Sequence, residues 1–176
     1  MKNFLKQGFT LIELLIVIAI IGILSGLIIT NVQGIRERAR DSRRKTDLGS
    51  LRQSLRLYYN DAGSFPLSSS YVIQGCGSFA SPSTCAWGTS AFAVNNGGNV
   101  TTYMSKLPYD PSSSTAVPIT YKYVSDGDTY VIVAKLENLS DQDIADSQSR
   151  CPTSYAAYRS GDPGSNILED YAVCEE

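Results

Sequence analysis

The order of hydrophobic and polar positions divides the chain into an apolar run, an amphipathic segment and a region of short alternating stretches. Residues 14–29 carry no charge, and Ser25 is the only polar side chain among these sixteen positions. The wider stretch 9–32 has 24 residues, with Glu13 as its only charged side chain. At about 1.5 Å per residue, a helix of this length crosses the hydrocarbon core of a bilayer, which is about 30 Å thick. We therefore expect a membrane-spanning helix over residues 9–32.

Residues 33–60 have the pattern of an amphipathic helix that continues from the apolar run. No proline interrupts the chain up to Tyr59, so we expect a single helix from Phe9 to Tyr59. Its apolar face is formed by positions spaced three and four apart, which are Leu48, Leu51, Leu55 and Tyr58. Because such a face needs a cover, we expect this half of the helix to pack against the C-terminal region.

Residues 61–176, which we call the head, contain the pattern of a small antiparallel β-sheet. Residues 119–124 alternate between polar and apolar side chains, Asp126-Gly127 is typical of a tight hairpin turn, and residues 129–134 are nearly all apolar. A strand with almost no polar positions is covered on both faces, so we expect residues 129–134 at the centre of the sheet, with the helix on one face. A third strand is expected at residues 167–173.

The first part of the head carries weaker signals. Gly63 and Pro66 end the helix, as glycine and proline commonly do. Residues 67–105 are rich in Ser, Gly and Asn, and we expect a surface-exposed loop with one short strand at residues 71–74. The predicted fold class is α+β, with a long N-terminal helix packed on a small antiparallel sheet.

Charge is distributed unevenly along the chain, although the net charge is only −2. Residues 1–60 hold ten basic and four acidic side chains, whereas residues 61–176 hold five and thirteen. Six of the basic residues fall within residues 36–45, which we call the basic segment. It fits a solvated helix with its own close ion pairs, a contact with the acidic head of a neighbouring copy, or a DNA contact. We favour the solvated helix.

The chain has no histidine and four cysteines, Cys76, Cys85, Cys151 and Cys174. Without histidine or C-x-x-C spacing, the usual zinc ligand sets and the commonest general base are missing, so we expect no metal, no cofactor and no enzymatic activity. An even number of cysteines in loops rich in Ser, Gly and Asn is typical of two disulfides. Four cysteines can form two disulfides in three different pairings. The pairs Cys76–Cys85 and Cys151–Cys174 are favoured because each closes a local loop. Four reduced thiols are the alternative.

Three aspartates, Asp141, Asp143 and Asp146, follow the last clear strand. Carboxylates are calcium ligands, but this spacing fits no EF-hand loop. Ser140 and Asp141 are good residues for capping a helix N-terminus, so we favour a capped turn over a calcium site.

The start of the chain carries a motif of high specificity. Residues 8–13 read Gly-Phe-Thr-Leu-Ile-Glu, follow a short basic leader and precede the apolar run. This arrangement resembles the class III signal of type IV pilins and pseudopilins. The resemblance implies that a prepilin peptidase removes residues 1–8 by cleavage between Gly8 and Phe9 and then methylates the new N-terminus at Phe9. A secretory signal peptide fits less well, because its apolar region has about 7–15 residues and ends in a small-x-small cleavage site.

Glu13 is an acid inside an apolar run, and its position needs a reason. A charged side chain in a bilayer costs up to roughly 3 kcal/mol, and such residues are candidates for function. The resemblance makes Glu13 the fifth residue of the mature chain, where the family has its glutamate. In a bundle of helices, the amine of Phe9 in a neighbouring copy would pair with Glu13 and set the axial register of assembly. An interfacial glutamate without that role is the alternative.

A second segment resembles one group within this family. Residues 107–111, Leu-Pro-Tyr-Asp-Pro, together with Tyr121 and Tyr123, are similar to a segment of the major pseudopilins of type II secretion systems. The tryptophan and glycine of the D-P-W-G motif in that segment are missing here, and the loop between Cys151 and Cys174 is closer to true pilins. We therefore expect a structural subunit of a type IV pilus. The alternatives are a major pseudopilin of a type II secretion system, a DNA-uptake or adhesion pilin, and a membrane-anchored domain that does not polymerise.

The resemblance also implies a location and partners. We expect a single pass through the inner membrane before assembly, with the head outside the cytoplasm, and an extracellular filament afterwards. The expected partners are other copies of the chain, the prepilin peptidase and the inner-membrane assembly platform, with DNA or surfaces as further candidates. Basic residues on the two flanks of the apolar run indicate the opposite orientation, because the basic segment outweighs the leader. We give precedence to the signal motif and the cysteines.

The mass of the mature protein tests the signal motif. We expect mass spectrometry of the intact mature chain to show the loss of residues 1–8 and one added methyl group on Phe9. A chain that retains its leader would contradict the resemblance.

Overall fold

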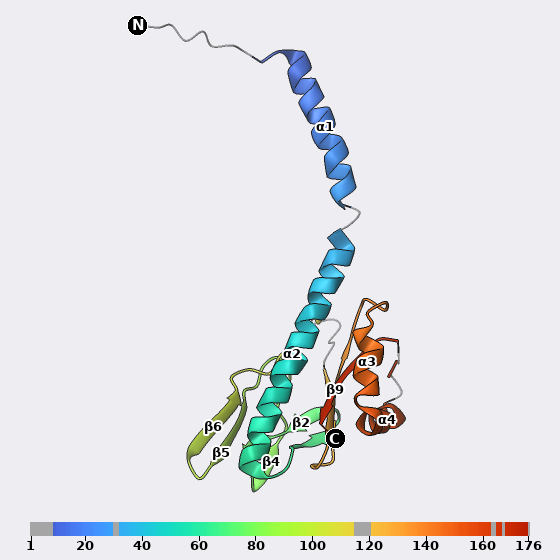
Figure 1. Ribbon diagram of the computed structural model, residues 1–176. Helices are drawn as coiled ribbons and strands as arrows, with labels where there is room; N and C mark the ends of the chain where they lie inside the picture. Colours follow the sequence, from blue (N-terminus) through green and yellow to red (C-terminus); the bar gives the residue numbers. More distant parts are fainter. Residues whose placement is uncertain (1–8, 30–31, 115–120, 163–164, 167, 176) are drawn as a thin grey trace, which may run out of the picture. The chain divides into compact units, whose positions relative to one another are not determined.

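The computed structural model describes residues 9–29, 32–114, 121–162, 165–166 and 168–175. The chain divides into two compact units, Met1–Glu37 and Arg38–Glu176, which are described separately. Helix α1 spans Leu11–Ile29 in the first unit, and helix α2 spans Val32–Ala62 and supplies the first helix of the second unit (Figure 1).

The two helices together occupy most of the stretch for which a single helix was predicted. The continuity expected between Phe9 and Tyr59 depends on residues 30–31, which lie outside the described residues. In the part of the chain that the structure describes, no helix combines the length and the apolarity needed to span a membrane.

The apolar face of α2 is buried, as its spacing predicted. Leu48, Leu51 and Leu55 are completely buried, and Tyr58 is almost so. They form one cluster with apolar side chains of the head. Packing of α2 against the head is therefore confirmed, and the cluster is the main core of the second unit.

Helix α2 ends just beyond that face. Gly63 has a φ of +76°, a left-handed conformation that glycine adopts without a steric penalty. Its N–H donates to the carbonyl of Tyr59 at 2.8 Å, which satisfies one of the last carbonyls of the helix.

The predicted antiparallel sheet is present and has three strands. These are β7 (Lys122–Ser125), β8 (Tyr130–Lys135) and β9 (Asp170–Glu175), and β8 lies between the other two. The central place of this apolar strand is confirmed, and so is the turn at Asp126-Gly127, where Gly127 has a φ of +100°. The third strand starts at Asp170, three residues later than predicted, and residues 119–120 lie outside the described residues.

Strand β8 separates two apolar clusters. Tyr130, Ile132 and Ala134 belong to the cluster that contains the apolar face of α2. Val131 and Val133 belong to a second cluster, formed with α4 (Pro152–Gly161) and the disulfide near it. A further short helix, α3 (Asp143–Ser149), lies beside β9 (Figure 1). The near absence of polar residues in β8 follows from this cover on both faces.

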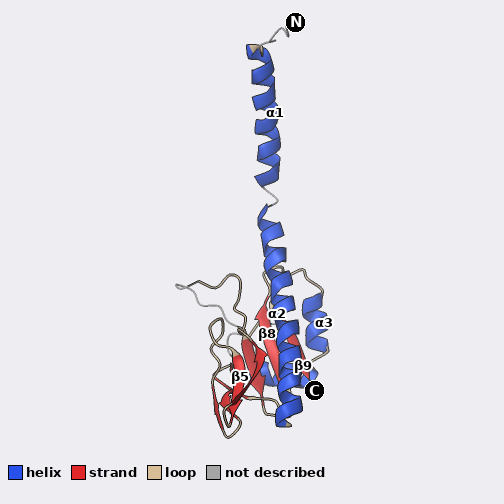
Figure 2. Cartoon of the chain, turned by 90° about the vertical axis from the view of Figure 1, so that its left-hand side faces the viewer, coloured by secondary structure: helices blue, strands red, loops and turns tan. Residues whose placement is uncertain are grey.

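Residues 67–105 form strands, so the prediction of a surface-exposed loop is wrong. The predicted strand at residues 71–74 is present as β2, and five others accompany it. The strands are β1 (Leu67–Ser69), β2 (Val72–Gln74), β3 (Cys76–Ser78), β4 (Ser81–Ser83), β5 (Phe92–Asn96) and β6 (Asn99–Met104). Strands β1 and β2 pair with each other, and the other four form a sheet in the order β4-β3-β5-β6 with one parallel pair, β3 and β5. Strand β5 of this sheet can be seen in Figure 2, together with β8 and β9 of the three-stranded sheet. Most of these strands have only three residues, which is too short for a periodic pattern.

The α+β fold class is confirmed, with a long helix packed on β-sheets. The four-stranded sheet contains parallel and antiparallel pairs, and the sequence did not reveal it. Phe92 and Val94 of β5 are buried in the main core, so this sheet belongs to the same core as α2.

Candidate functional site

Helix α1 begins with reciprocal hydrogen bonds between Thr10 and Glu13. Glu13 Oε2 accepts from the backbone N–H of Thr10 at 2.8 Å and from its hydroxyl at 2.7 Å, and the N–H of Glu13 donates to Thr10 Oγ1 at 3.3 Å. This capping box satisfies backbone donors that a helix N-terminus leaves unpaired. The T-x-x-E spacing is visible in the sequence, but only the charge of Glu13 was considered there, so the cap was missed.

The remainder of α1 presents apolar side chains on all sides. Its large apolar residues have exposed fractions between 46% and 77%, and they are Leu11, Ile12, Leu14, Leu15, Ile16, Val17, Ile18, Ile20, Ile21, Ile23 and Leu24. A helix that is apolar all round is stable when lipid or other apolar helices cover it. The apolar surface of α1 therefore needs lipid or other apolar helices to cover it.

The second unit contains a buried cation, Arg44, whose side chain is 2% exposed. Arg44 Nε and Nη2 donate to the two carboxylate oxygens of Asp110 at 2.7 and 2.8 Å, which is a bidentate pair. Arg44 Nη1 donates to Asp41 Oδ1 at 2.6 Å, and Nη2 also donates to Ser112 Oγ at 2.7 Å. These contacts attach the middle of α2 to the loop after β6.

Asp41 and Glu137 extend this network to the loop that follows β8. Asp41 accepts from the backbone N–H groups of Glu137 and Asn138, at 3.0 and 2.9 Å. The carboxylate of Glu137 lies 2.8 Å from Arg44 Nη1. It also accepts hydrogen bonds from Nε and Nη2 of Arg40. One turn of α2 is thus joined to two separate loops of the head by charge-assisted hydrogen bonds.

The electrostatics of the network favour the charged forms of Arg44 and Glu137. Burial opposes the charge of Arg44, but hydrogen bonds with Asp110, Glu137 and Asp41 outweigh it and raise the pKa of the guanidinium. Hydrogen bonds from Arg40 lower the pKa of Glu137 from its ordinary value of 4.5 to about 2, against the opposing effect of burial.

Lys45 occupies the acidic cluster that the sequence offered as a calcium candidate. Its Nζ lies 2.6 Å from Asp141 Oδ2 and 2.6 Å from Asp143 Oδ2. The other carboxylate oxygen of Asp141 accepts the N–H of Asp143 at 3.0 Å, which closes a turn before α3. The N-cap of α3 is Gln142, which makes no side-chain capping hydrogen bond, so neither Ser140 nor Asp141 caps this helix as the sequence predicted. In the described residues, no group of three or more His, Cys, Asp or Glu side chains could hold a metal ion.

The basic segment is therefore an internal anchor for much of its length. The solvated-helix interpretation is wrong for Arg40, Arg44 and Lys45, which pair with acids of their own head. Arg36 and Arg38 are exposed, as that interpretation expected. Apart from Asp41, the acids that bind Arg40, Arg44 and Lys45 come from residues 66 to 98 positions later in the chain, so no local spacing rule could have identified them.

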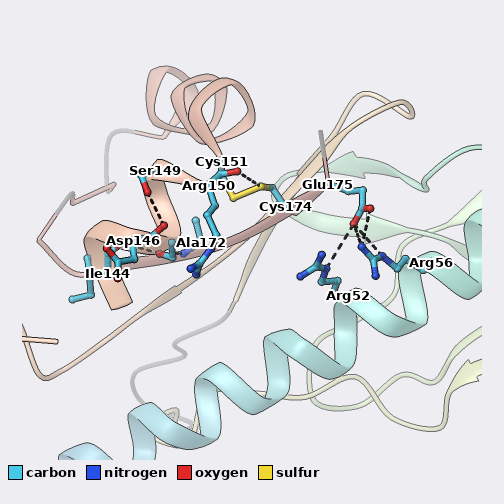
Figure 3. The surroundings of a disulfide bond; sticks show 11 residues. Arg52, Arg56, Ile144, Asp146, Ser149, Arg150, Cys151, Ala172, Cys174 and Glu175 are labelled. Atoms are coloured by element: carbon cyan, nitrogen blue, oxygen red, sulfur yellow. Dashed lines mark hydrogen bonds and ion pairs between the residues drawn. A yellow bond between two sulfur atoms is a disulfide. The ribbon is translucent and has the colours of Figure 1, made fainter. Parts of the chain in front are cut away.

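The two disulfides join the pairs that the sequence favoured. Cys76 is bonded to Cys85, and Cys151 is bonded to Cys174. Figure 3 shows the second bond between the start of α4 and strand β9. On the same strand, Glu175 accepts hydrogen bonds from Arg56 of α2 at 2.9 Å and lies 3.7 Å from Arg52 Nε (Figure 3). The C-terminal strand is held to α4 by a covalent bond and to α2 by ion pairs.

The segment that resembles the major pseudopilins supplies a central part of the anchor. Asp110 is the buried partner of Arg44, and its Oδ1 also accepts the N–H of Ser112 at 2.8 Å. Tyr121 is buried and donates its hydroxyl to Asp47 Oδ2 of α2 at 2.8 Å, while Tyr123 donates to the carbonyl of Pro66 at 2.6 Å. These residues connect α2 with the start of the three-stranded sheet.

The predicted processing residues lie at the start of the chain. Gly8 falls outside the described residues, and Phe9 is 86% exposed directly before α1. The structure brings Glu13 together with Thr10 of the same chain. The four cysteines lie in the second unit and serve the head alone.

Known proteins resemble both the start of the chain and most of its length. The family described as the prokaryotic N-terminal methylation motif matches residues 4–29. The type II secretion system core protein G of Vibrio cholerae serotype O1 is 31% identical over 129 residues, which cover 73% of this chain and 77% of that protein. The protein of the same name from Aeromonas hydrophila is 31% identical over 106 residues, covering 60% of this chain and 67% of that protein. The type IV major pilin protein PilA of Myxococcus xanthus is 42% identical over 56 residues, covering 32% of this chain and 26% of that protein. No solved structure is a significant match.

Removal of the buried cation should destabilise the head. Arg44→Met leaves Asp110 and Asp41 buried without their partner, and we expect the free energy of unfolding to fall by about 3–5 kcal/mol. Arg38→Met is the matched control, because Arg38 is exposed on the same helix, and a change within about 0.5 kcal/mol is expected. Urea unfolding of the full chain in detergent measures the free energy of unfolding of each variant. The fluorescence of Trp87, the single tryptophan, is the probe. Equal effects of the two substitutions would contradict the anchor.

Acid should weaken the same network through Glu137. Its folded-state pKa lies below the ordinary value, so its contribution to stability is present above about pH 4.5 and is lost as the pH falls through about 2. We expect Glu137→Gln to be less stable than the unchanged chain at neutral pH and to converge with it as the pH falls through this window. Unfolding curves at a series of pH values check this, and a constant difference between the two proteins would contradict it.

Proposed function

The chain belongs to the family of type IV pilins and pseudopilins, and we propose that it is a structural subunit of a type II secretion pseudopilus. The observation that carries the proposal is the similarity to two type II secretion core proteins over 67% and 77% of their lengths. Members of this family are structural subunits. The sequence placed a type IV pilus subunit first, and the relatives favour its alternative.

A type IV pilus subunit is the second candidate. It is favoured by the similarity to the type IV major pilin of Myxococcus xanthus, which is higher in identity but is confined to 56 residues. Matches of this length are expected from the N-terminal helix alone, because both kinds of filament use it. The similarity that extends into the head therefore weighs more than the identity of the short match.

Assembly in this proposal proceeds through α1. Cleavage between Gly8 and Phe9 and methylation of Phe9 would leave an apolar helix with a cationic amine at its end. Lipid of the inner membrane would cover the helix before assembly, with the head outside the cytoplasm, and α1 helices of other copies would cover it afterwards. The exposed apolar side chains of α1 on all its sides support such a change of cover.

Glu13 has two roles in this scheme. In the single chain its carboxylate accepts two hydrogen bonds from Thr10, so the acid is not left without a partner. In the filament the amine of a neighbouring Phe9 would compete for the same carboxylate and would fix the axial register. The capping box lowers the cost of holding an acid in an apolar helix until that neighbour arrives.

Replacement of the gene by variants at Glu13 tests the function and the role of this acid together. Cells without the gene are expected to lose exported proteins from the culture medium while surface pili remain, and the unchanged gene should restore export. Glu13→Gln keeps a side-chain oxygen for the capping box but removes the charge, and Glu13→Ala removes both. We expect both variants to be processed at Gly8 and neither to form filaments or restore export.

The alternatives give different results in the same cells. Loss of surface pili with normal export would favour the type IV pilus subunit over the pseudopilin. Normal assembly of Glu13→Gln with failure of Glu13→Ala would show that the acid acts as a helix cap and not through its charge.

A further inference from the structure

The disulfide between Cys151 and Cys174 lines a pocket of the head. The pocket has a volume of about 420 Å³, which lies within the range of small-molecule sites, about 300–1,000 Å³. Its lining consists of Arg52 from α2, Arg150 and Cys151 from the junction of α3 and α4, and residues 171–174 of β9. Figure 3 shows both arginine side chains between β9 and α2. The disulfide is thus accessible from a space that can hold a small molecule.

The charge of this pocket is positive. Arg52 and Arg150 are exposed, and no acidic side chain is among the described residues that line the pocket. Glu175 is the acid at its border, and it accepts hydrogen bonds from Arg56 and lies 3.7 Å from Arg52 Nε. One carboxylate is therefore shared by two guanidinium groups, and Arg150 adds a third cation. The pocket attracts small anions and repels small cations.

The two cysteines of this disulfide are not equivalent. Cys151 is 2% exposed, whereas Cys174 is partly exposed, so Cys174 is the residue that an incoming thiolate can reach. Cys151 is the N-cap residue of α4, a helix of 10 residues. A helix N-terminus stabilises a thiolate and lowers the pKa of the thiol, which makes that thiol the better leaving group. Attack at Cys174 with departure of Cys151 is the favoured direction of exchange.

We propose that the pocket takes a small anionic thiol of the glutathione class, whose thiolate attacks Cys174 Sγ and opens the disulfide. The bond between the two cysteine sulfurs breaks as the bond to Cys174 forms, and Cys151 leaves as a thiolate. A second thiolate attacks the thiol-derived sulfur of this mixed disulfide and releases Cys174. Two thiols are thereby oxidised to one small disulfide, the protein disulfide is reduced, and the protons of the two thiols pass to the two cysteines.

Reduction changes how the C-terminal strand is held. It removes the covalent bond between α4 and β9, while the ion pairs of Glu175 with α2 do not depend on the disulfide. Contact through α1 involves neither cysteine, so this inference goes beyond the proposed function. It is measured on the purified full chain and can fail or succeed whether or not the chain forms a pseudopilus.

Reduction rates with thiols of different charge test the pocket. The full chain in detergent is treated with glutathione, which is an anion, with neutral 2-mercaptoethanol or with cationic cysteamine, and each rate constant is expressed per thiolate. Acid quenching, alkylation and peptide mass spectrometry follow the two disulfides separately. The ratio of the glutathione rate constant to that of 2-mercaptoethanol is expected to be about tenfold higher for Cys151–Cys174 than for Cys76–Cys85. The corresponding cysteamine ratio should be lower for Cys151–Cys174.

The Cys76–Cys85 disulfide is an internal control. It also joins a buried cysteine, Cys85, to a partly exposed one, Cys76. Residues 62–105, which contain both, include no charged side chain. Differences in the intrinsic reactivity of the two disulfides cancel in the ratio of rate constants, so the ratio reports the effect of charge.

Substitutions of arginine locate that effect. Arg150→Gln and Arg52→Gln should each lower the glutathione ratio of Cys151–Cys174 about three- to fivefold and leave that of Cys76–Cys85 unchanged. Arg159→Gln is the matched control, because it removes the same charge from an exposed position of α4 outside the pocket, and it should change neither ratio.

The site of attack is read from the mixed disulfide. Trypsin cleaves after Arg150 and Arg159, so Cys151 and Cys174 lie in different peptides, and glutathione is expected on the peptide with Cys174. Glutathione on Cys151, equal ratios for the two disulfides, or equal effects of Arg150→Gln and Arg159→Gln would each overturn the proposal.

Discussion

The buried guanidinium of Arg44 is the interaction on which the second unit depends. An unpaired cation at 2% exposure would be strongly destabilising, and the protein satisfies this one with Asp110, Asp41, Glu137 and Ser112. Asp41 lies on α2 itself, and the other partners come from two loops of the head. Apolar contact alone leaves the orientation of α2 on the head free to vary. The hydrogen bonds of the planar Arg44 guanidinium are directional, so they fix that orientation as well. The apolar face from Leu48 to Tyr58 is buried in the main core, and the network at Arg44 determines where on the head α2 lies.

That anchor changes the meaning of the unequal charge of the chain. The sequence favoured a solvated helix for the basic segment, with a neighbouring head or DNA as alternative contacts, and the structure shows that part of the segment pairs with acids of its own head. Arg40, Arg44 and Lys45 are occupied within the chain, which leaves fewer cations for DNA or for a neighbouring head.

Residue patterns predicted the parts of the fold that depend on one periodic element. The spacing of Leu48, Leu51 and Leu55 was sufficient to identify the covered face of α2, and the apolar β8 was sufficient to identify the centre of the sheet. Strands β1, β3 and β4 were not recognisable, because three residues rich in Ser, Gly or Pro have no period and their pairing depends on distant backbone. The Arg44 network was not recognisable either, because Asp110 and Glu137 are chosen by tertiary structure. The capping box at Thr10 could have been found from T-x-x-E spacing.

A helical reconstruction of the assembled filament by electron cryomicroscopy tests the central claim most directly. The account predicts that α1 helices of different copies cover one another along the filament axis, and that Arg44 in each head contacts Asp110 of the same chain. A filament in which Arg44 pairs with an acid of a neighbouring chain would contradict the intrachain anchor. A filament in which α1 faces water would contradict assembly through the N-terminal helix.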